Sequence, residues 1–164
     1  MIDATYLEAH WPASCLCLKK GAGRLIGLTK AGLVSKLHAV TVALGRSVGI
    51  FIIAPSVSDY VGARALTGSL PQADWLLADR GFDADWFHNS LKEMKIEPCI
   101  PLRDSRKKVI LNDKARYKLR HKIKNTFGKL KEWRRIATRY DMSPELFLLA
   151  IVLFLLRVLR VEKL

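Results

Sequence analysis

The sequence predicts an α/β protein in which a mixed β-sheet is flanked by helices. Three observations predict it: β-prone runs come early in the chain, short strand and helix patterns alternate in the middle, and two long helical patterns close the chain. The chain has 164 residues, of which 50% are hydrophobic, and this is enough for one normal core. We therefore expect a single domain over residues 1–164.

The first elements are expected to be strands. Ile2–Tyr6 predicts a very short strand. Lys19–Arg24 and Gly27–Gly32 form a basic, glycine-bearing segment without apolar periodicity, which indicates a loop. Ser35–Leu44 and Ser47–Ala54 are β-prone runs separated by Gly45-Arg46. This layout predicts a β-hairpin.

Helices and strands are expected to alternate through the middle of the chain. Ser58 is a candidate N-cap for a helix that continues to Leu70. Ala73–Asp79 predicts a short buried strand that ends on an acid, and Gly81 stops it. Apolar residues at helical spacing predict a helix over Asp83–Lys95, with Asp83 as its cap, and Pro98–Leu102 predicts a further strand.

Two helices are expected to complete the chain after a charged loop at Arg103–Lys108. They run from about Asn112 to Trp133 and from about Ser143 to Val161, with Asn112 and Ser143 as plausible caps. The apolar run Leu146–Leu156 is too short for a membrane span, which needs about 20 residues. We interpret it as a helix buried in a soluble core, and we expect no membrane association.

The charge balance indicates a polyanionic partner. The formal net charge is +13, and Lys and Arg that neutralise phosphates release condensed counterions. A ribosomal, RNA-binding or non-specific nucleic-acid role fits this charge equally well. No GxGxxG or Walker pattern supports nucleotide binding. Cys15, Cys17 and Cys99 are read as reduced thiols, and the N-terminus lacks a signal-peptide pattern, so we expect a cytoplasmic protein.

Four side chains of the helix after Asn112 are expected to share one face. They are spaced three, four and seven residues apart, so at about 100° per residue they fall within roughly 60° of one another. The four are Tyr117, Arg120, Lys124 and Lys131. An adjacent apolar stripe is expected to face the core; it contains Leu119, Ile123, Phe127 and Leu130.

This spacing resembles Tyr-x2-Arg-x3-Glu-x6-Lys, the signature of a large group of bacterial insertion-sequence DDE transposases. Tyr117, Arg120 and Lys131 match it in register. Other segments resemble the same group, in the same order along the chain. They are Asp3-Ala4-Thr5, Lys36-Leu37-His38-Ala39, Leu77-Ala78-Asp79-Arg80-Gly81-Phe82-Asp83 and the segment from Trp133 to Asp141.

The resemblance implies an RNase H-like fold and DNA transposition by two-metal phosphodiester cleavage and strand transfer. In such a site three carboxylates hold two magnesium ions, and Asp3, Asp79 and position 124 fall at the three places. Asp3 and Asp79 are accordingly the expected metal ligands. Because the family has more chain before its first aspartate, we expect the domain to be N-terminally truncated.

Lys124 stands where the family signature has glutamate. An ammonium group cannot coordinate magnesium and would repel it, and Glu132 is about 12 Å further along the helix. We therefore expect a catalytically impaired remnant, in which Lys124 either pairs with Asp3 or Asp79 or extends into solvent. The alternatives are an enzyme that survives with a partner chain or another acid, and a non-catalytic basic DNA- or RNA-binding module.

The expected partner is DNA, bound by a homo-oligomer on DNA ends in the nucleoid. The resemblance assigns Tyr117, Arg120 and Lys131 to DNA contacts and support of the site. Charge adds candidates for sequence-independent contacts with the DNA backbone. These are Arg103, Arg106, Lys107, Lys108, Arg134 and Arg135. His38 is interpreted as a strand or core histidine rather than a ligand.

Overall fold

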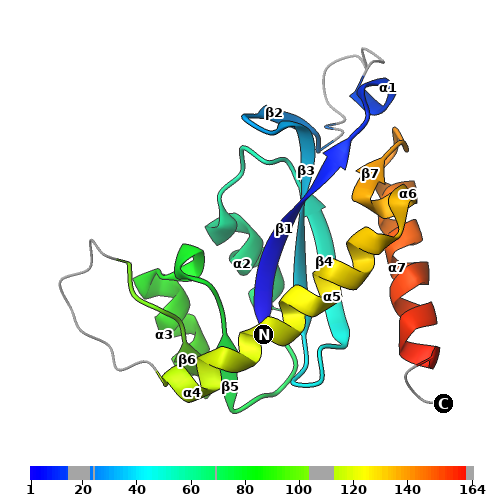
Figure 1. Ribbon diagram of the computed structural model, residues 1–164. Helices are drawn as coiled ribbons and strands as arrows, with labels where there is room; N and C mark the ends of the chain where they lie inside the picture. Colours follow the sequence, from blue (N-terminus) through cyan, green and yellow to red (C-terminus); the bar gives the residue numbers. More distant parts are fainter. Residues whose placement is uncertain (15–22, 24, 69, 104–112, 162–164) are drawn as a thin grey trace. The chain divides into compact units, whose positions relative to one another are not determined.

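The computed structural model describes residues 1–14, 23, 25–68, 70–103 and 113–161 (Figure 1). The chain divides into two compact units, each assembled from separate stretches of sequence. The first unit comprises Met1–Asp3, Ala39–Gly49 and Ser58–Asn125; the second comprises Ala4–His38, Ile50–Val57 and Thr126–Leu164. A single domain over residues 1–164 stays a prediction.

The larger sheet is mixed, as the sequence predicts. Its strands are β1 (Ile2–Ala9), β2 (Gly27–Thr29), β3 (Gly32–Thr41), β4 (Ser47–Ile53) and β7 (Thr138–Arg139). The order is β2-β3-β1-β7, and β4 also pairs with β3. Strands β1 and β7 are parallel, with Glu8 opposite Thr138, whereas β2 and β3 are antiparallel, with Leu28 opposite Leu33. The α/β class and the hairpin formed by β3 and β4 are confirmed.

The expected loop over residues 27–32 is wrong, because β2 and β3 form a second hairpin there. Gly32 adopts a φ of +104°, which side-chain-bearing residues rarely adopt, and a Cβ on Gly27 would lie 2.7 Å from Cγ of Pro55. Gly32 is thus needed for the backbone conformation at the start of β3, and Gly27 for its close approach to Pro55. Strand β1 also continues three residues beyond the predicted end at Tyr6.

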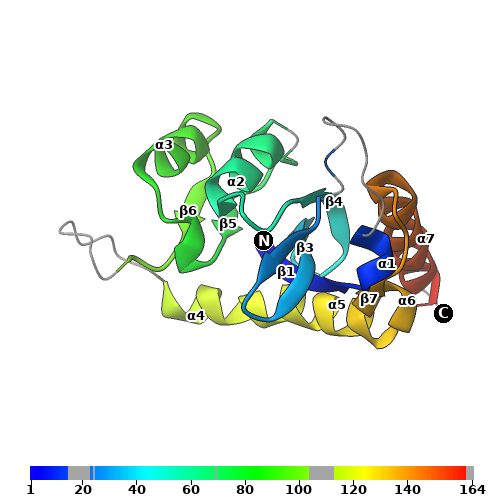
Figure 2. The same cartoon turned by 90° about the horizontal axis from the view of Figure 1, so that it is seen from above.

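The first unit contains a small parallel sheet covered by two helices. Strands β5 (Trp75–Leu77) and β6 (Glu97–Cys99) pair in parallel, and helices α2 (Asp59–Thr67) and α3 (Asp85–Glu93) lie beside them (Figure 2). Phe87 and Leu91 are four residues apart, so they share the buried face of α3. Both predicted strands exist but are shorter than expected.

A turn of 3₁₀-helix interrupts the long helix that was expected over residues 112–133. The segment consists of α4 (Lys114–Tyr117), the 3₁₀ turn η2 (Lys118–Arg120) and α5 (His121–Glu132). Asp113 Oδ1 accepts hydrogen bonds from the backbone N–H groups of Ala115 at 2.9 Å and Arg116 at 3.1 Å. Asp113 therefore caps the helix, because its side chain accepts hydrogen bonds from N–H groups that have no partner within the helix. The expected cap Asn112 lies outside the described residues.

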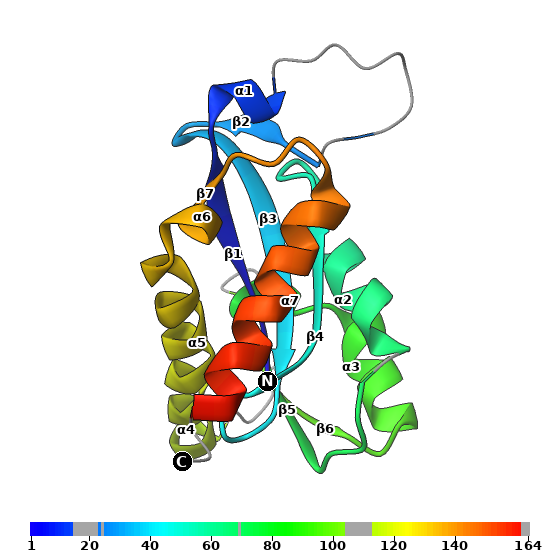
Figure 3. The ribbon, with the colours of Figure 1, turned by 90° about the vertical axis from the view of Figure 1, so that its right-hand side faces the viewer.

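The second unit contains α1 (Trp11–Ser14), α6 (Arg134–Ala137) and α7 (Pro144–Val161), the last two shown in Figure 3. The cap predicted for α7 is confirmed, because Ser143 Oγ accepts from the Leu146 N–H at 3.2 Å. Arg139 of β7 is fully buried. Its guanidinium donates to Ser35 Oγ at 2.9 Å and to the carbonyl oxygens of Asp141 and Met142 at 2.8 and 3.0 Å, which ties the loop before α7 to the sheet.

The expectation that α7 is buried in the core is wrong. One face is buried through Phe147 and Ile151, but four leucines of the other face are 52–60% exposed. They are Leu146, Leu149, Leu153 and Leu156. An apolar run without polar residues carries no signal that tells a half-buried helix from a fully buried one. Within the described part of the chain, no helix combines the length and apolar character that a membrane crossing requires.

Candidate functional site

Asp3, Asp79 and Arg120 meet inside the first unit. Asp3 lies on β1, Asp79 follows β5 by two residues, and Arg120 ends the 3₁₀ turn η2. Arg120 Nη2 lies 2.6 Å from Oδ1 of Asp3 and 3.1 Å from Oδ2 of Asp79. The two expected acids are therefore close in space, although 75 residues separate them in the sequence.

The local structure orients Asp79 toward the arginine. Asp79 is the N-cap of the 3₁₀ helix η1 (Arg80–Phe82), and its Oδ1 accepts from the Arg80 N–H at 2.7 Å. Because Oδ1 of Asp79 accepts this bond, Oδ2 of Asp79 remains available to contact Arg120. The Asp79 side chain is 48% exposed and that of Asp3 only 9%, so one acid is open to solvent and the other is enclosed.

Arg120 is buried, with 8% of its surface exposed, and its Nη1 donates to the Tyr117 hydroxyl at 3.2 Å. Burial alone would lower the pKa of the Arg120 guanidinium, but the charges of Asp3 and Asp79 outweigh it and raise this pKa above its ordinary value. Arg120 is thus a permanent cation that contacts both Asp3 and Asp79, which together form the acid pair. The phosphate contact expected for it competes with these two carboxylates.

Lys124 has a different environment from Arg120. Its side chain is exposed, and it forms no ion pair with any carboxylate of the described residues. Of the two alternatives for Lys124, an ion pair with Asp3 or Asp79 and extension into solvent, the described residues fit the second. The acid pair already has its cation in Arg120.

The acids do not form a metal-binding cluster. Among the described residues, no group of three or more His, Cys, Asp or Glu side chains could hold a metal ion. The third position of the predicted site carries Lys124, and the two remaining acids contact the same guanidinium nitrogen. The donor set seen here does not fit the magnesium site that the sequence led us to expect.

The other candidates for DNA contact are distributed over both units. Tyr117 belongs to the acid site through Arg120, whereas Lys131, Arg134 and Arg135 are exposed in the second unit. Arg135 also lies 3.4 Å from Asp141. Arg106, Lys107 and Lys108 lie outside the described residues.

Arg103 and Asp83 have structural partners. The Arg103 guanidinium donates to the carbonyl oxygens of Arg80 and Gly81 at 3.3 and 3.0 Å. Asp83 was expected to cap α3, but the N-cap is Ala84 and Asp83 Oδ1 instead lies 3.0 Å from His88 Nε2. A side chain that would otherwise cap the helix is drawn inward because Oδ2 accepts the Arg103 N–H at 2.9 Å.

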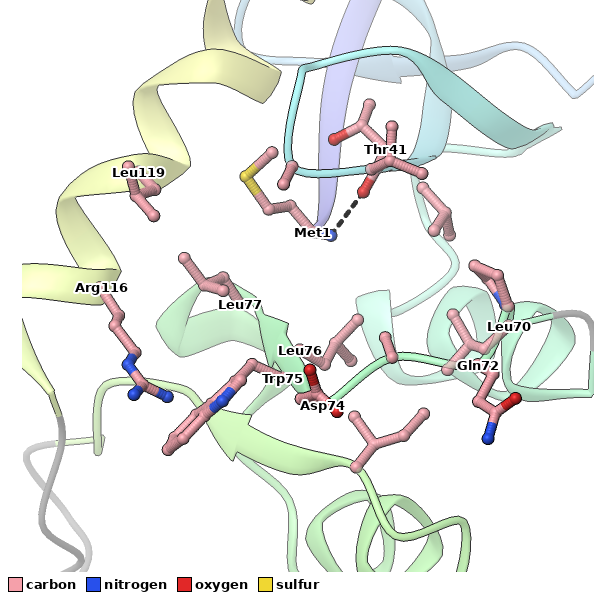
Figure 4. Close-up of a pocket in the computed structure, with 16 residues that line it drawn as sticks. Met1, Thr41, Leu70, Gln72, Asp74, Trp75, Leu76, Leu77, Arg116 and Leu119 are labelled. Atoms are coloured by element: carbon pink, nitrogen blue, oxygen red, sulfur yellow. Dashed lines mark hydrogen bonds between the residues drawn. The ribbon is translucent and has the colours of Figure 1, made fainter.

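A cavity of about 500 Å³ lies in the first unit, and no sequence pattern predicted it (Figure 4). Its walls are mainly apolar, with Trp75, Leu77 and Leu119 among them, and the Arg116 guanidinium stacks over the Trp75 ring at 3.5 Å. The Met1 amino group beside it donates to the Thr41 carbonyl oxygen at 2.6 Å. Burial lowers the pKa of this amino group to about 6.

His38 is a core residue, as interpreted from the sequence. It is fully buried on β3 and its ring stacks on Phe51, with the ring centres 5.0 Å apart.

The family model for the transposase DDE domain matches residues 2–159. The chain belongs to the DDE transposase family. It is 32% identical over 117 residues to a putative transposase for insertion sequence element IS6501 from Brucella ovis. That match covers 71% of this chain and 90% of the relative. No solved structure matches the chain.

The DDE transposase family model covers both residues of the acid pair, Asp3 and Asp79. The function of this family is DNA transposition, a process in which the protein binds DNA. The family match begins at Ile2 and therefore includes both Asp3 and Asp79.

Proposed function

We propose that this chain is a transposase-family protein that binds DNA at a catalytic site impaired by the loss of its third acid. Asp3 and Asp79 are the inherited first and second acids, and Lys124 occupies the position of the third. The observation that carries the proposal is the contact of one Arg120 nitrogen with both acids, while position 124 presents an exposed cation.

The fold that we propose for the chain is RNase H-like. The mixed sheet supports it, because β1 carries the first acid and pairs with both β3 and β7. A helical segment that carries Tyr117, Arg120 and Lys124 also supports it, since the third catalytic position of such a site lies on a helix.

Magnesium chemistry does not follow from these side chains. Magnesium prefers oxygen ligands in near-octahedral geometry, and two-metal phosphoryl transfer needs carboxylates around both ions. A lysine ammonium at position 124 and a guanidinium between the two acids supply positive charge instead. The magnesium expected for the family therefore has no suitable ligand set among the residues that the structure describes.

DNA binding is supported by exposed cations and by the net charge of +13. Lys131, Arg134 and Arg135 are exposed, and we propose that they contact phosphates together with Tyr117, Arg106, Lys107 and Lys108. The phosphate contact expected for Arg120 would require it to leave Asp3 and Asp79. Each neutralised phosphate steepens the fall of affinity with salt, by about 0.9 in the logarithmic slope for duplex DNA. The whole chain is proposed to act as a homo-oligomer on two DNA ends.

The test compares magnesium-dependent cleavage of DNA that carries the element ends by the natural chain and by Lys124→Glu. Lys118→Glu makes the same charge change at an exposed position of η2 and serves as the matched control. Circular dichroism first establishes that all three proteins are folded. Cleavage by Lys124→Glu alone supports an inherited site silenced by Lys124; cleavage by the natural chain overturns the proposed impairment.

A second candidate function is a non-catalytic basic module that binds DNA or RNA without sequence preference. The exposure of Lys131, Arg134 and Arg135 favours it, because phosphate contacts alone carry no sequence information. Equal affinity for element-end DNA, unrelated DNA and RNA, with the same steep salt dependence, would favour this module over the transposase-derived site.

A further inference from the structure

We propose that the Arg120 guanidinium takes the bridging-cation position between Asp3 and Asp79 and thereby keeps divalent cations out of the acid pair. The inference rests on the proposed function, because it treats both acids as the inherited catalytic pair. It assigns Arg120 a role that a DNA contact does not describe, and it adds a second obstacle to metal binding as long as Lys124 stands in place of the third acid.

A single atom makes the bridge. Nη2 of Arg120 contacts Oδ1 of Asp3 at 2.6 Å and Oδ2 of Asp79 at 3.1 Å. A divalent ion shared by these oxygens would have to lie between them, at about 2.0–2.1 Å from each for magnesium. The nitrogen and the ion cannot occupy that position together.

The arginine is held in place from its other side. Nη1 donates to the Tyr117 hydroxyl at 3.2 Å, and only 8% of the Arg120 surface is exposed. Bonds in which both partners are charged are stronger than neutral ones, and they strengthen further away from water. Displacement of Arg120 by an ion would therefore break three contacts and leave a buried cation beside another cation.

The exposed Lys124 cannot replace Arg120 in this role, because it contacts no carboxylate of the described residues. The two cations thus act differently. Lys124 removes a ligand from the predicted site, whereas Arg120 neutralises the ligands that remain.

The experiment measures binding of manganese alone, without DNA, to the full chain by calorimetry and by the shift of the unfolding temperature. The variants are Arg120→Gln, Arg120→Lys and the matched control Lys118→Gln, which removes one exposed positive charge from the same turn. Arg120→Gln is expected to bind manganese at least about tenfold more tightly than the natural chain. Saturating manganese should raise its unfolding temperature by roughly 3 °C.

Further variants locate the ion. Asp79→Asn added to Arg120→Gln should abolish the gained binding, and Lys118→Gln and Arg120→Lys should bind no better than the natural chain. Equal binding by the natural chain and Arg120→Gln, or binding by neither, overturns the proposal. A gain in Lys118→Gln also overturns it, because net charge would then suffice.

A measurement on the natural chain keeps the proposal testable if Arg120→Gln does not fold. Manganese broadens the NMR signals of nuclei close to it, so the side-chain signals of Asp3, Asp79 and Arg120 can be followed during a titration. Unchanged signals support the proposal, and broadening at low millimolar manganese overturns it. Because these readouts use neither DNA nor cleavage, the proposed DNA function can fail independently of them.

Discussion

Nε2 of His88 lies 3.0 Å from Oδ1 of Asp83, and both side chains are buried in the first unit. The same carboxylate accepts the backbone N–H of Arg103, four residues after the end of β6, at 2.9 Å. Asp83 therefore joins the start of α3 to a segment 20 residues further along.

Replacement of Asp83 by alanine should lower the free energy of unfolding by about 3 kcal/mol, because the His88 ring and the Arg103 amide lose a buried acceptor. Urea denaturation measures the change. The control is Asp74→Ala, which removes an equal charge from an exposed position and should change stability by less than about 0.5 kcal/mol. Equal effects of the two substitutions would show that net charge, rather than the buried contact, is responsible.

Two serines at helix starts should respond differently to alanine. Ser143 Oγ accepts the Leu146 N–H, so Ser143→Ala should destabilise the protein by about 1 kcal/mol. Ser58 precedes α2 but its side chain makes no capping bond to that helix, so Ser58→Ala should have little effect. Thermal unfolding of both variants checks this, and a larger loss for Ser58→Ala would contradict the cap geometry.

Alanine substitutions on the two faces of α7 should lower the stability of the protein by different amounts. Ile151 is fully buried and its change to alanine should cost about 2–5 kcal/mol, whereas Leu149 is 52% exposed and the same change should cost far less. Chemical denaturation of the two variants gives both values. Similar large losses would mean that the leucine face is covered in solution.

Cys99 should react slowly with alkylating reagents in the folded protein. Burial raises the pKa of its thiol, and the charge of Asp113 raises it further, so less thiolate is present at neutral pH than in the unfolded chain. Mass spectrometry of a Cys15→Ser, Cys17→Ser variant follows this thiol alone. Reaction rates that are equal with and without urea would contradict the burial of Cys99.

The sequence predicted the elements that carry the acid pair because short apolar runs and the family signature locate them. It did not predict the arginine bridge. Ideal helical spacing places Arg120 and Lys124 on one face, but it does not say how far along the helix that face stays covered by the rest of the unit. Arg120 is buried, whereas Lys124, one turn further along, is exposed.

Sequence patterns also failed to predict strand β2 and the face of α7 that is exposed to solvent. Gly27–Thr29 is too short to show alternation, so its strand character depends on pairing with β3. In α7 every position from Leu146 to Leu156 is apolar, and nothing in that run marks the side that faces solvent. Tertiary contacts decided both cases.

The enclosure of Arg139 has a consequence for proteolysis. Trypsin must take an arginine side chain into its own pocket and bind the flanking backbone in extended form. The Arg139 guanidinium is bound to Ser35, Asp141 and Met142 inside the fold, and its extended backbone is already paired with β1. Cleavage after this residue therefore requires the second unit to open, so the appearance of that one fragment in a timed digest reports how often β7 leaves its sheet.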